Sequence, residues 1–114
     1  MSTDLHVSPE ARRADLALRL AATAFDVPIE EMRADTRRGA TVAFARQVGM
    51  YIAHVGFGLS LSKVAQAFRR DRTTVTHACH LVEDAREDPD FDEAIACIEA
   101  AARVVTGITA LART

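Results

Sequence analysis

The sequence predicts an all-α fold: a small helical bundle that contains a helix-turn-helix and ends in a longer C-terminal helix. Hydrophobic residues make up 49% of the 114 residues and aromatic residues only 5%. No segment alternates apolar and polar residues as a half-buried strand would. A chain of this length forms one domain around a single modest core. We expect a flexible N-terminus over residues 1–8, a folded domain over 9–100 and a helical extension over 101–114.

The N-terminal third predicts one long helix and one short one. Ser8 is a suitable N-cap and Pro9 suits the first helical position, so the first helix begins here and extends to about Phe25. A short helical turn is expected at Pro28–Met32, and an arginine-rich loop follows over 34–39.

A longer central helix is expected over about Ala40–Val55, because apolar residues recur on one of its faces. Gly56 and Gly58 end it. The residues expected to be buried are Val42, Ala45, Val48, Ile52 and Val55.

Residues 59–79 carry the most specific pattern in the chain, two short helices joined by a tight basic turn. Ser60 is a suitable N-cap for the first helix and Asp71 for the second. In a helix-turn-helix, the first residues of the second helix enter the major groove of DNA. Arginine suits guanine edges, and threonine offers a hydroxyl and a methyl group. The buried stripes are Leu61, Val64, Ala65 and Phe68, then Val75, Ala78, Cys79 and Val82, and the exposed reading residues are Arg72, Thr73, Thr74 and Thr76.

The last helix is expected over about Phe91–Leu111, with Asp90 and Glu93 placed as a capping box. Its second half has more apolar surface than one small domain can cover, and such a surface often packs on a partner. The alternative is that this half folds back over the first helix. The residues expected to bind a protein partner or a second copy are Val104, Val105, Ile108 and Leu111.

Charge is distributed unevenly, although the net charge is only −2. Eight basic residues and two acidic ones lie between Arg33 and Arg72, whereas eight acidic residues accompany Arg86 between Glu83 and Glu99. A basic face backed by an acidic end orients a protein on DNA, because phosphates attract one side and repel the other.

Three stretches resemble the DNA-binding domain of the bacterial replication initiator DnaA. The resemblance covers about residues 12–100 and is most specific between Arg38 and Cys79. The stretches are residues 45–53 (ARQVGMYIA), 61–68 (LSKVAQAF) and 70–79 (RDRTTVTHAC).

The resemblance implies a set of DNA-binding residues. Arg38 would enter the minor groove, Arg46 would face the DNA from the central helix, and the turn that begins at Arg70 would read the major groove. Together with the exposed residues of the helix pattern and their polar and basic neighbours, the predicted DNA-binding set is Arg37, Arg38, Arg46, Gln47, Ser62, Lys63, Arg69, Arg70, Asp71, Arg72, Thr73, Thr74, Thr76 and His77.

Two departures from the family pattern concern the reading turn. Arg72 replaces the family's histidine, and Arg69 stands where the family has glycines, with one residue fewer. We therefore expect the binding mode to be retained while the preferred DNA sequence changes.

The sequence shows no pattern of a metal-binding, nucleotide-binding or catalytic site beside the helix-turn-helix. His77, Cys79 and His80 point in different directions on one helix, so no metal site is expected. Cys79 and Cys97 are expected to be buried free thiols. No GxxxxGK[ST] loop occurs in the 114 residues, and no nucleophile has a base set beside it, so we expect neither a nucleotide, a cofactor nor an enzymatic activity.

The N-terminal residues lack the plan of a signal peptide, and no apolar stretch is expected to reach membrane-spanning length. We expect a cytoplasmic, nucleoid-associated protein without a membrane partner. Two functions remain: a sequence-specific binder of double-stranded DNA that regulates transcription with a protein partner, or a replication-control protein or adaptor that acts through protein contacts.

Overall fold

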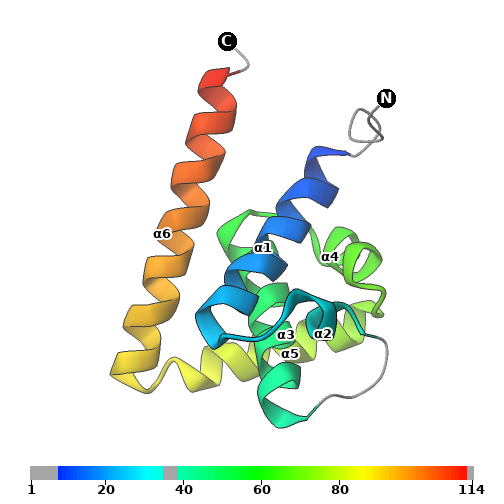
Figure 1. The fold of residues 1–114 in the computed structure, drawn as a ribbon, viewed down its shortest axis with the longest axis vertical. Coiled ribbons are helices and arrows are strands. Elements are labelled where there is room, and N and C mark those ends of the chain that lie inside the picture. Colours follow the sequence, from blue (N-terminus) through cyan, green and yellow to red (C-terminus); the bar gives the residue numbers. More distant parts are fainter. Residues whose placement is uncertain (1–7, 35–38, 113–114) are drawn as a thin grey trace.

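The computed structural model describes residues 8–34 and 39–112, and within these ranges every regular element is a helix (Figure 1). The all-α prediction is confirmed. Residues 1–7 of the expected N-terminal segment lie outside the described residues. The elements are α1 (Pro9–Phe25), α2 (Ile29–Arg33), α3 (Ala40–Tyr51), a π-helical turn η2 (Ile52–Gly56), α4 (Leu61–Phe68), α5 (Arg72–Ala85) and α6 (Pro89–Ala112).

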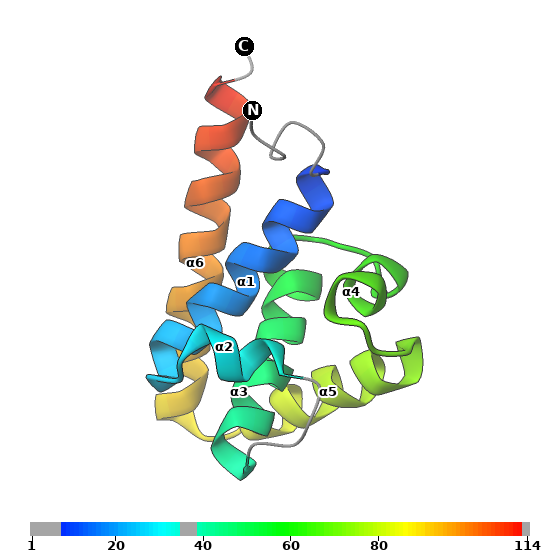
Figure 2. The same ribbon diagram turned by 45° about the vertical axis from the view of Figure 1, so that its right-hand side comes forward.

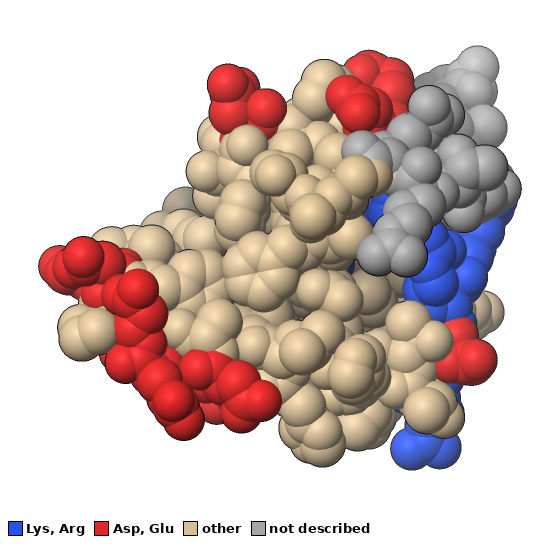
Figure 3. Space-filling model, turned by 90° about the horizontal axis from the view of Figure 1, so that it is seen from below, with Lys and Arg blue, Asp and Glu red and all other residues tan. Residues whose placement is uncertain are grey.

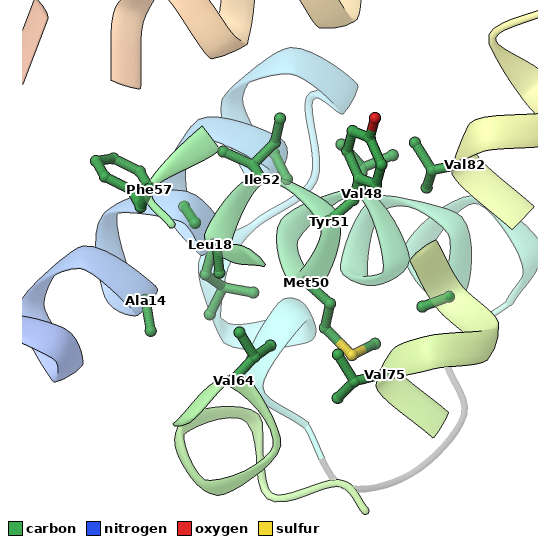
Figure 4. Close-up of a cluster of buried hydrophobic side chains, with 14 of the residues drawn as sticks. Ala14, Leu18, Val48, Met50, Tyr51, Ile52, Phe57, Val64, Val75 and Val82 are labelled. Carbon is green, nitrogen blue, oxygen red and sulfur yellow. The ribbon is translucent and has the colours of Figure 1, made fainter. Parts of the chain in front are cut away.

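The core is built around α3, with α1 and α5 packed against it (Figure 2). Val48 and Ile52 are fully buried in the middle, as predicted from their spacing. Val64 from α4 and Val75 from α5 reach the same cluster (Figure 4). The helix-turn-helix pair therefore shares one hydrophobic core with the rest of the domain.

The start of α1 is the one predicted from Ser8 and Pro9. The Ser8 Oγ accepts a hydrogen bond from the backbone N–H of Ala11 at 3.0 Å, and Pro9 occupies the first turn. The helix ends after Phe25, where Asp26 adopts a left-handed conformation with φ 54°.

The central helix ends differently from the prediction. The backbone N–H of Phe57 donates to the carbonyl of Ile52 at 2.9 Å, an i to i−5 bond that makes the last turn a π-helix. The wider turn rotates Val55 away from the core, so this residue is 46% exposed and its expected burial is wrong. The same turn lets α6 come close, because a Cβ at Gly56 would lie 3.4 Å from the Cβ of Ala102.

The first half of α6 is anchored to the domain. Ile95 and Ala102 are buried, and the rings of Phe91 and Phe44 lie 5.6 Å apart. The helix begins at Pro89 rather than Phe91, because Asp88 and not Asp90 caps it. The Asp88 Oδ1 accepts from the backbone N–H of Asp90 at 2.9 Å, so the predicted capping box is wrong by two residues.

Arg86 fixes the angle between α5 and α6. Its Nε donates to Asp92 at 2.5 Å and its Nη1 donates to Glu99 at 3.1 Å and to the Tyr51 hydroxyl at 3.0 Å. The Tyr51 hydroxyl in turn donates to Glu83 at 2.8 Å. Burial by itself would lower the pKa of the Arg86 guanidinium, but these acceptors raise it, so the side chain stays charged.

The two cysteines differ in their surroundings. Cys79 is buried on α5, and this burial raises the pKa of its thiol. Cys97 is exposed, because it lies on the face of α6 that points away from the domain, so its predicted burial is wrong.

The second half of α6 extends beyond the domain. Val104, Ile108 and Leu111 are 61%, 60% and 74% exposed, so these side chains do not fold back over α1. The whole of α6 is also long and apolar enough, by length and composition alone, to cross a membrane. The expectation that no segment reaches that length is therefore wrong, because three of the five charged residues of α6, Asp90, Asp92 and Glu93, lie at its N-terminal end.

Candidate nucleic-acid interface

The turn between α4 and α5 is held by a side-chain cap on each helix. The Ser60 Oγ accepts from the backbone N–H of Lys63 at 3.1 Å, and the Asp71 Oδ1 accepts from that of Thr74 at 2.9 Å. Both predicted caps are confirmed. Hydrogen bonds from the side chain and backbone of Thr74 lower the pKa of the Asp71 carboxyl, so the cap is anionic at neutral pH.

Two arginines form the turn itself. Arg69 has φ 55°, in the left-handed region that favours glycine, so the side chain is kept there against a conformational cost. The Arg70 Nη1 donates to the backbone carbonyls of Phe68 and Arg69, each at 3.1 Å. Arg70 thereby stabilises the turn, while the Arg69 side chain projects into solvent.

The first two turns of α5 present polar side chains on the face opposite the core. Arg72, Thr73, Thr74 and His77 are exposed and Thr76 is half-buried. A shallow hollow of about 550 Å³ lies over this face, lined by Arg72, Thr73, Thr76, His77 and His80. His80 was not among the residues predicted from the sequence, although its position three residues after His77 places it on the same face of the helix.

The surface around the turn is positively charged. Ser62 and Lys63 are exposed on the first turn of α4. Lys63, Arg69 and Arg72 form no ion pair with the part of the chain that the structure describes. Figure 3 shows lysine and arginine gathered on one side of the molecule with an acidic residue among them, a row of aspartate and glutamate on the opposite side, and two further acidic patches along the edge between them. The predicted separation of charge is therefore present in three dimensions.

Arg46 requires a correction, because its side chain does not face solvent on α3. It is only 9% exposed, and its guanidinium donates to the backbone carbonyls of Met32, Glu31 and Ala34 at 3.1, 3.2 and 3.4 Å. Burial, together with the nearby charge of Arg70, lowers the pKa of Arg46. In this structure Arg46 fixes the end of α2 and the start of the loop that follows.

The other predicted residues are placed less directly. Gln47 is half-buried on α3. Arg37 and Arg38 lie outside the described residues. Arg33, counted among the basic residues of this region, forms an ion pair with Asp15 of α1, so it adds little to the positive surface.

A second hollow connects the turn with α1 and α2. It has a volume of about 430 Å³, an apolar floor that includes Leu18 and Phe68, and the side chains of Arg46, Arg69 and Arg70 at its polar side. Arginine side chains therefore continue from the turn along this hollow to the end of α2.

Residues 15–82 match the sequence model of a protein family that is described as the bacterial DnaA protein helix-turn-helix. A solved structure of a DNA replication initiation factor superposes with a TM-score of 0.72 at 29% sequence identity, over 82% of this chain and 29% of that one.

Curated relatives give the same similarity. The chromosomal replication initiator protein DnaA of Pseudothermotoga lettingae is 43% identical over 60 residues, which are 53% of this chain and 13% of the relative. The DnaA of Lachnoclostridium phytofermentans is 31% identical over 94 residues, 78% of this chain and 20% of the relative. The DnaA of Nostoc punctiforme is 37% identical over 73 residues, which are 63% of this chain and 15% of the relative. This chain thus spans a fifth or less of the length of these relatives.

Proposed function

We propose, because this chain belongs to the bacterial DnaA helix-turn-helix family, that it binds double-stranded DNA in a sequence-specific manner through the turn between α4 and α5. The face from Thr73 to Thr76 enters the major groove, and Arg38 enters the adjacent minor groove. The observation that carries this proposal is the start of α5, where Arg72 and the threonines are exposed while Val75 is fully buried.

The packing of α5 on the core suits this helix to contact bases in the major groove. Val75, Ala78 and Val82 fix α5 on the core, so the polar face is presented in one orientation. A rigid helix keeps side chains in register with base edges, which a mobile loop would do less well. Arg72 can contact the O6 and N7 atoms of a guanine with two hydrogen bonds.

Phosphate contacts come from the surrounding charges. Lys63, Arg69 and Arg72 are exposed and form no ion pair with the described residues, so their charge is available to the DNA backbone. The acidic end of the molecule is repelled by phosphate and orients the domain with the turn toward the duplex.

The cellular role that we propose is transcription regulation together with a protein partner. The alternative is replication control by competition for initiator sites. The relatives are named as replication initiators, which favours replication control. This chain matches only a small part of their length, which leaves room for a different role. Both proposed roles begin with the recognition of DNA. A genome-wide map of bound sites distinguishes them: sites in promoters support regulation, and sites confined to the replication origin support replication control.

The first test measures binding to a random duplex library by gel shift, followed by titration of the selected duplex at increasing salt. With about 4–6 phosphates neutralised, the slope of log affinity against log salt is expected to be about −4 to −5. A flat salt response, or no binding at low salt, contradicts the proposal.

The second test separates base reading from phosphate attraction. Arg72→Ala is expected to cost about 1–3 kcal/mol of binding free energy on the selected duplex and to relax specificity at one position. Lys63→Ala is expected to weaken selected and scrambled duplexes equally. Arg72→His, which restores the family residue, is expected to shift the selected sequence. An equal loss on both duplexes for Arg72→Ala contradicts its assignment to base reading.

An adaptor function is the second candidate, and the exposed apolar end of α6 and the net charge of −2 favour it. In that case the turn binds no DNA and the chain acts through protein contacts alone. The gel shift distinguishes the two candidates, because an adaptor leaves the random duplexes unshifted at every salt concentration.

A further inference from the structure

α6 carries two apolar stripes on different faces. The inner stripe, which includes Ile95 and Ala102, packs on the domain. The outer stripe recurs at spacings of three, four, three, four and three residues, the heptad pattern of helices that pack along a seam. Its members are Ala94, Cys97, Ala101, Val104, Ile108 and Leu111.

The outer stripe lies at the surface of the molecule. Val104, Ile108 and Leu111 are among the most exposed large apolar side chains of the described residues, and Cys97 is exposed as well. No charged residue interrupts the stripe over its eighteen residues, a length of about 27 Å along the helix. A long apolar helix matches this face in length and chemistry.

We propose that a second copy of this chain covers the outer stripe, with the two α6 helices antiparallel. In the register that we propose, Ala94 packs on the partner's Leu111, Cys97 on the partner's Ile108 and Ala101 on the partner's Val104. The numbers of the two residues in each of these pairs sum to 205. Every layer then joins one small side chain to one large one, and the two-fold symmetry repeats each pair.

The sizes of the side chains select the antiparallel arrangement over the parallel one. A parallel pair would stack alanine on alanine at residue 94 and leucine on leucine at residue 111, so the two helices would diverge toward their C-terminal ends. The antiparallel pair has layers of nearly equal width along its whole length, which allows even packing.

Charge favours the same arrangement. The start of α6 and the residues before it are acidic, with Glu87, Asp88, Asp90 and Glu93 exposed. A parallel pair would place the two acidic ends together. An antiparallel pair places each acidic end beside the C-terminal half of the partner's α6. Among the described residues after Glu99, that half carries one charge, the positive charge of Arg103. Opposed helix dipoles add to this preference.

A membrane is a weaker occupant for this helix. Glu99 is paired with Arg86 at 3.1 Å, and Ile95 and Ala102 are buried in the domain, so the first half of α6 cannot leave it without breaking these contacts. The remaining residues, 103–112, extend about 15 Å, about half of the hydrocarbon thickness of a bilayer.

The first test is sedimentation equilibrium of the full chain without DNA, so that its outcome is independent of the DNA-binding proposal. A dimer is expected. Ile108→Lys places a charge in the seam and is expected to raise the dissociation constant at least ~10-fold. Ala110→Lys adds the same side chain to an exposed position outside the stripe and is expected to leave it unchanged. Thermal melting of both variants at low concentration checks that the domain stays folded.

The second test is cross-linking with a short bis-maleimide, which reads the direction of the helices. The native chain, with Cys97 as its exposed thiol, is expected to give no cross-linked dimer, because antiparallel helices place the two Cys97 residues about 16 Å apart along the axis. Ile108→Cys is expected to cross-link through Cys97 and residue 108 of the partner. The double variant with Cys97→Ser in addition is expected to lose the cross-link.

Three outcomes overturn the proposal. A monomer at every concentration up to about 100 µM removes the second copy. A cross-link through Cys97 in the native chain shows a parallel pair. Co-sedimentation of the monomer with liposomes, lost in Ile108→Lys and retained in Ala110→Lys, assigns the stripe to a membrane instead.

Discussion

The two ends of α5 use arginine in opposite ways. At the C-terminal end, Arg86 is 19% exposed and donates to Asp92, Glu99 and Tyr51. At the N-terminal end, Arg69 and Arg72 are exposed and form no ion pair within the described residues. The difference lies in the neighbours, since carboxylates surround one end and are nearly absent from the other.

This difference indicates which arginines are available to a ligand. A guanidinium whose donors are already satisfied by protein acceptors would have to lose those hydrogen bonds before it could bind phosphate. Arg46 belongs with Arg86 in this respect, because three backbone carbonyls accept from it. Charge counted along the sequence therefore overstates the surface that DNA would encounter.

Arg86→Ala is the strongest test of this division. It leaves the half-buried Glu99 and the buried Tyr51 without their shared donor, so we expect a loss of about 3 kcal/mol in the free energy of unfolding. DNA affinity of the folded protein is expected to stay the same. Urea denaturation and the gel shift measure the two quantities. Arg103→Ala on the exposed side of α6 is the control, and a similar loss there would contradict the explanation.

Arg46→Ala is expected to act on stability rather than on base reading. Three carbonyls at the end of α2 lose their donor, and we expect a loss of about 2 kcal/mol in the free energy of unfolding. Arg46→Lys is expected to recover only part of it, because an ammonium cannot reproduce the planar array of donors. If Arg46→Ala keeps full stability but weakens all DNA duplexes, the side chain reorients toward phosphate on binding.

Arg69→Gly is expected to have opposite effects on stability and binding. Glycine relieves the left-handed strain at φ 55° but adds freedom to the unfolded chain, so we expect a net gain of about 0.5 kcal/mol in the free energy of unfolding. The loss of one phosphate contact is expected to reduce the salt slope by about 0.9. Arg69→Ala loses the same charge and keeps the strain, so it should match Arg69→Gly in binding but not in stability.

The last effect leaves stability unchanged near neutral pH, because it concerns the ionisation of Tyr51, the only tyrosine of the chain, at alkaline pH. Burial and the hydrogen bond to Glu83 raise its pKa to about 12 from an ordinary value of 10.0. The neutral phenol is favoured in the folded state, so this contribution to stability is complete below pH 10 and is lost as the pH rises toward 12. A phenolate absorbance titration is expected to show ionisation near pH 12 in the folded chain, and near pH 10 in urea.

The sequence predicted the helices whose ends depend on local chemistry. The caps at Ser8, Ser60 and Asp71 act within three residues of themselves, so each N-terminus could be identified without tertiary information. The π-helical turn at Ile52–Gly56 could not be predicted, because it exists where α6 packs closely on Gly56. The exposure of Val55 and the shift of the cap from Asp90 to Asp88 are likewise results of that packing and of the turn before α6.

By itself, the sequence determined the fold class, the turn between α4 and α5 and the polar face at the start of α5, because helix periodicity and caps are local properties. Only the tertiary structure decided which arginines are available. Arg46 and Arg86 are bound by acceptors that lie 12–15 and 6–35 residues away in the sequence. A charge is neutralised by the groups that folding brings within hydrogen-bonding distance, and that distance is set by the packing of helices rather than by the order of residues.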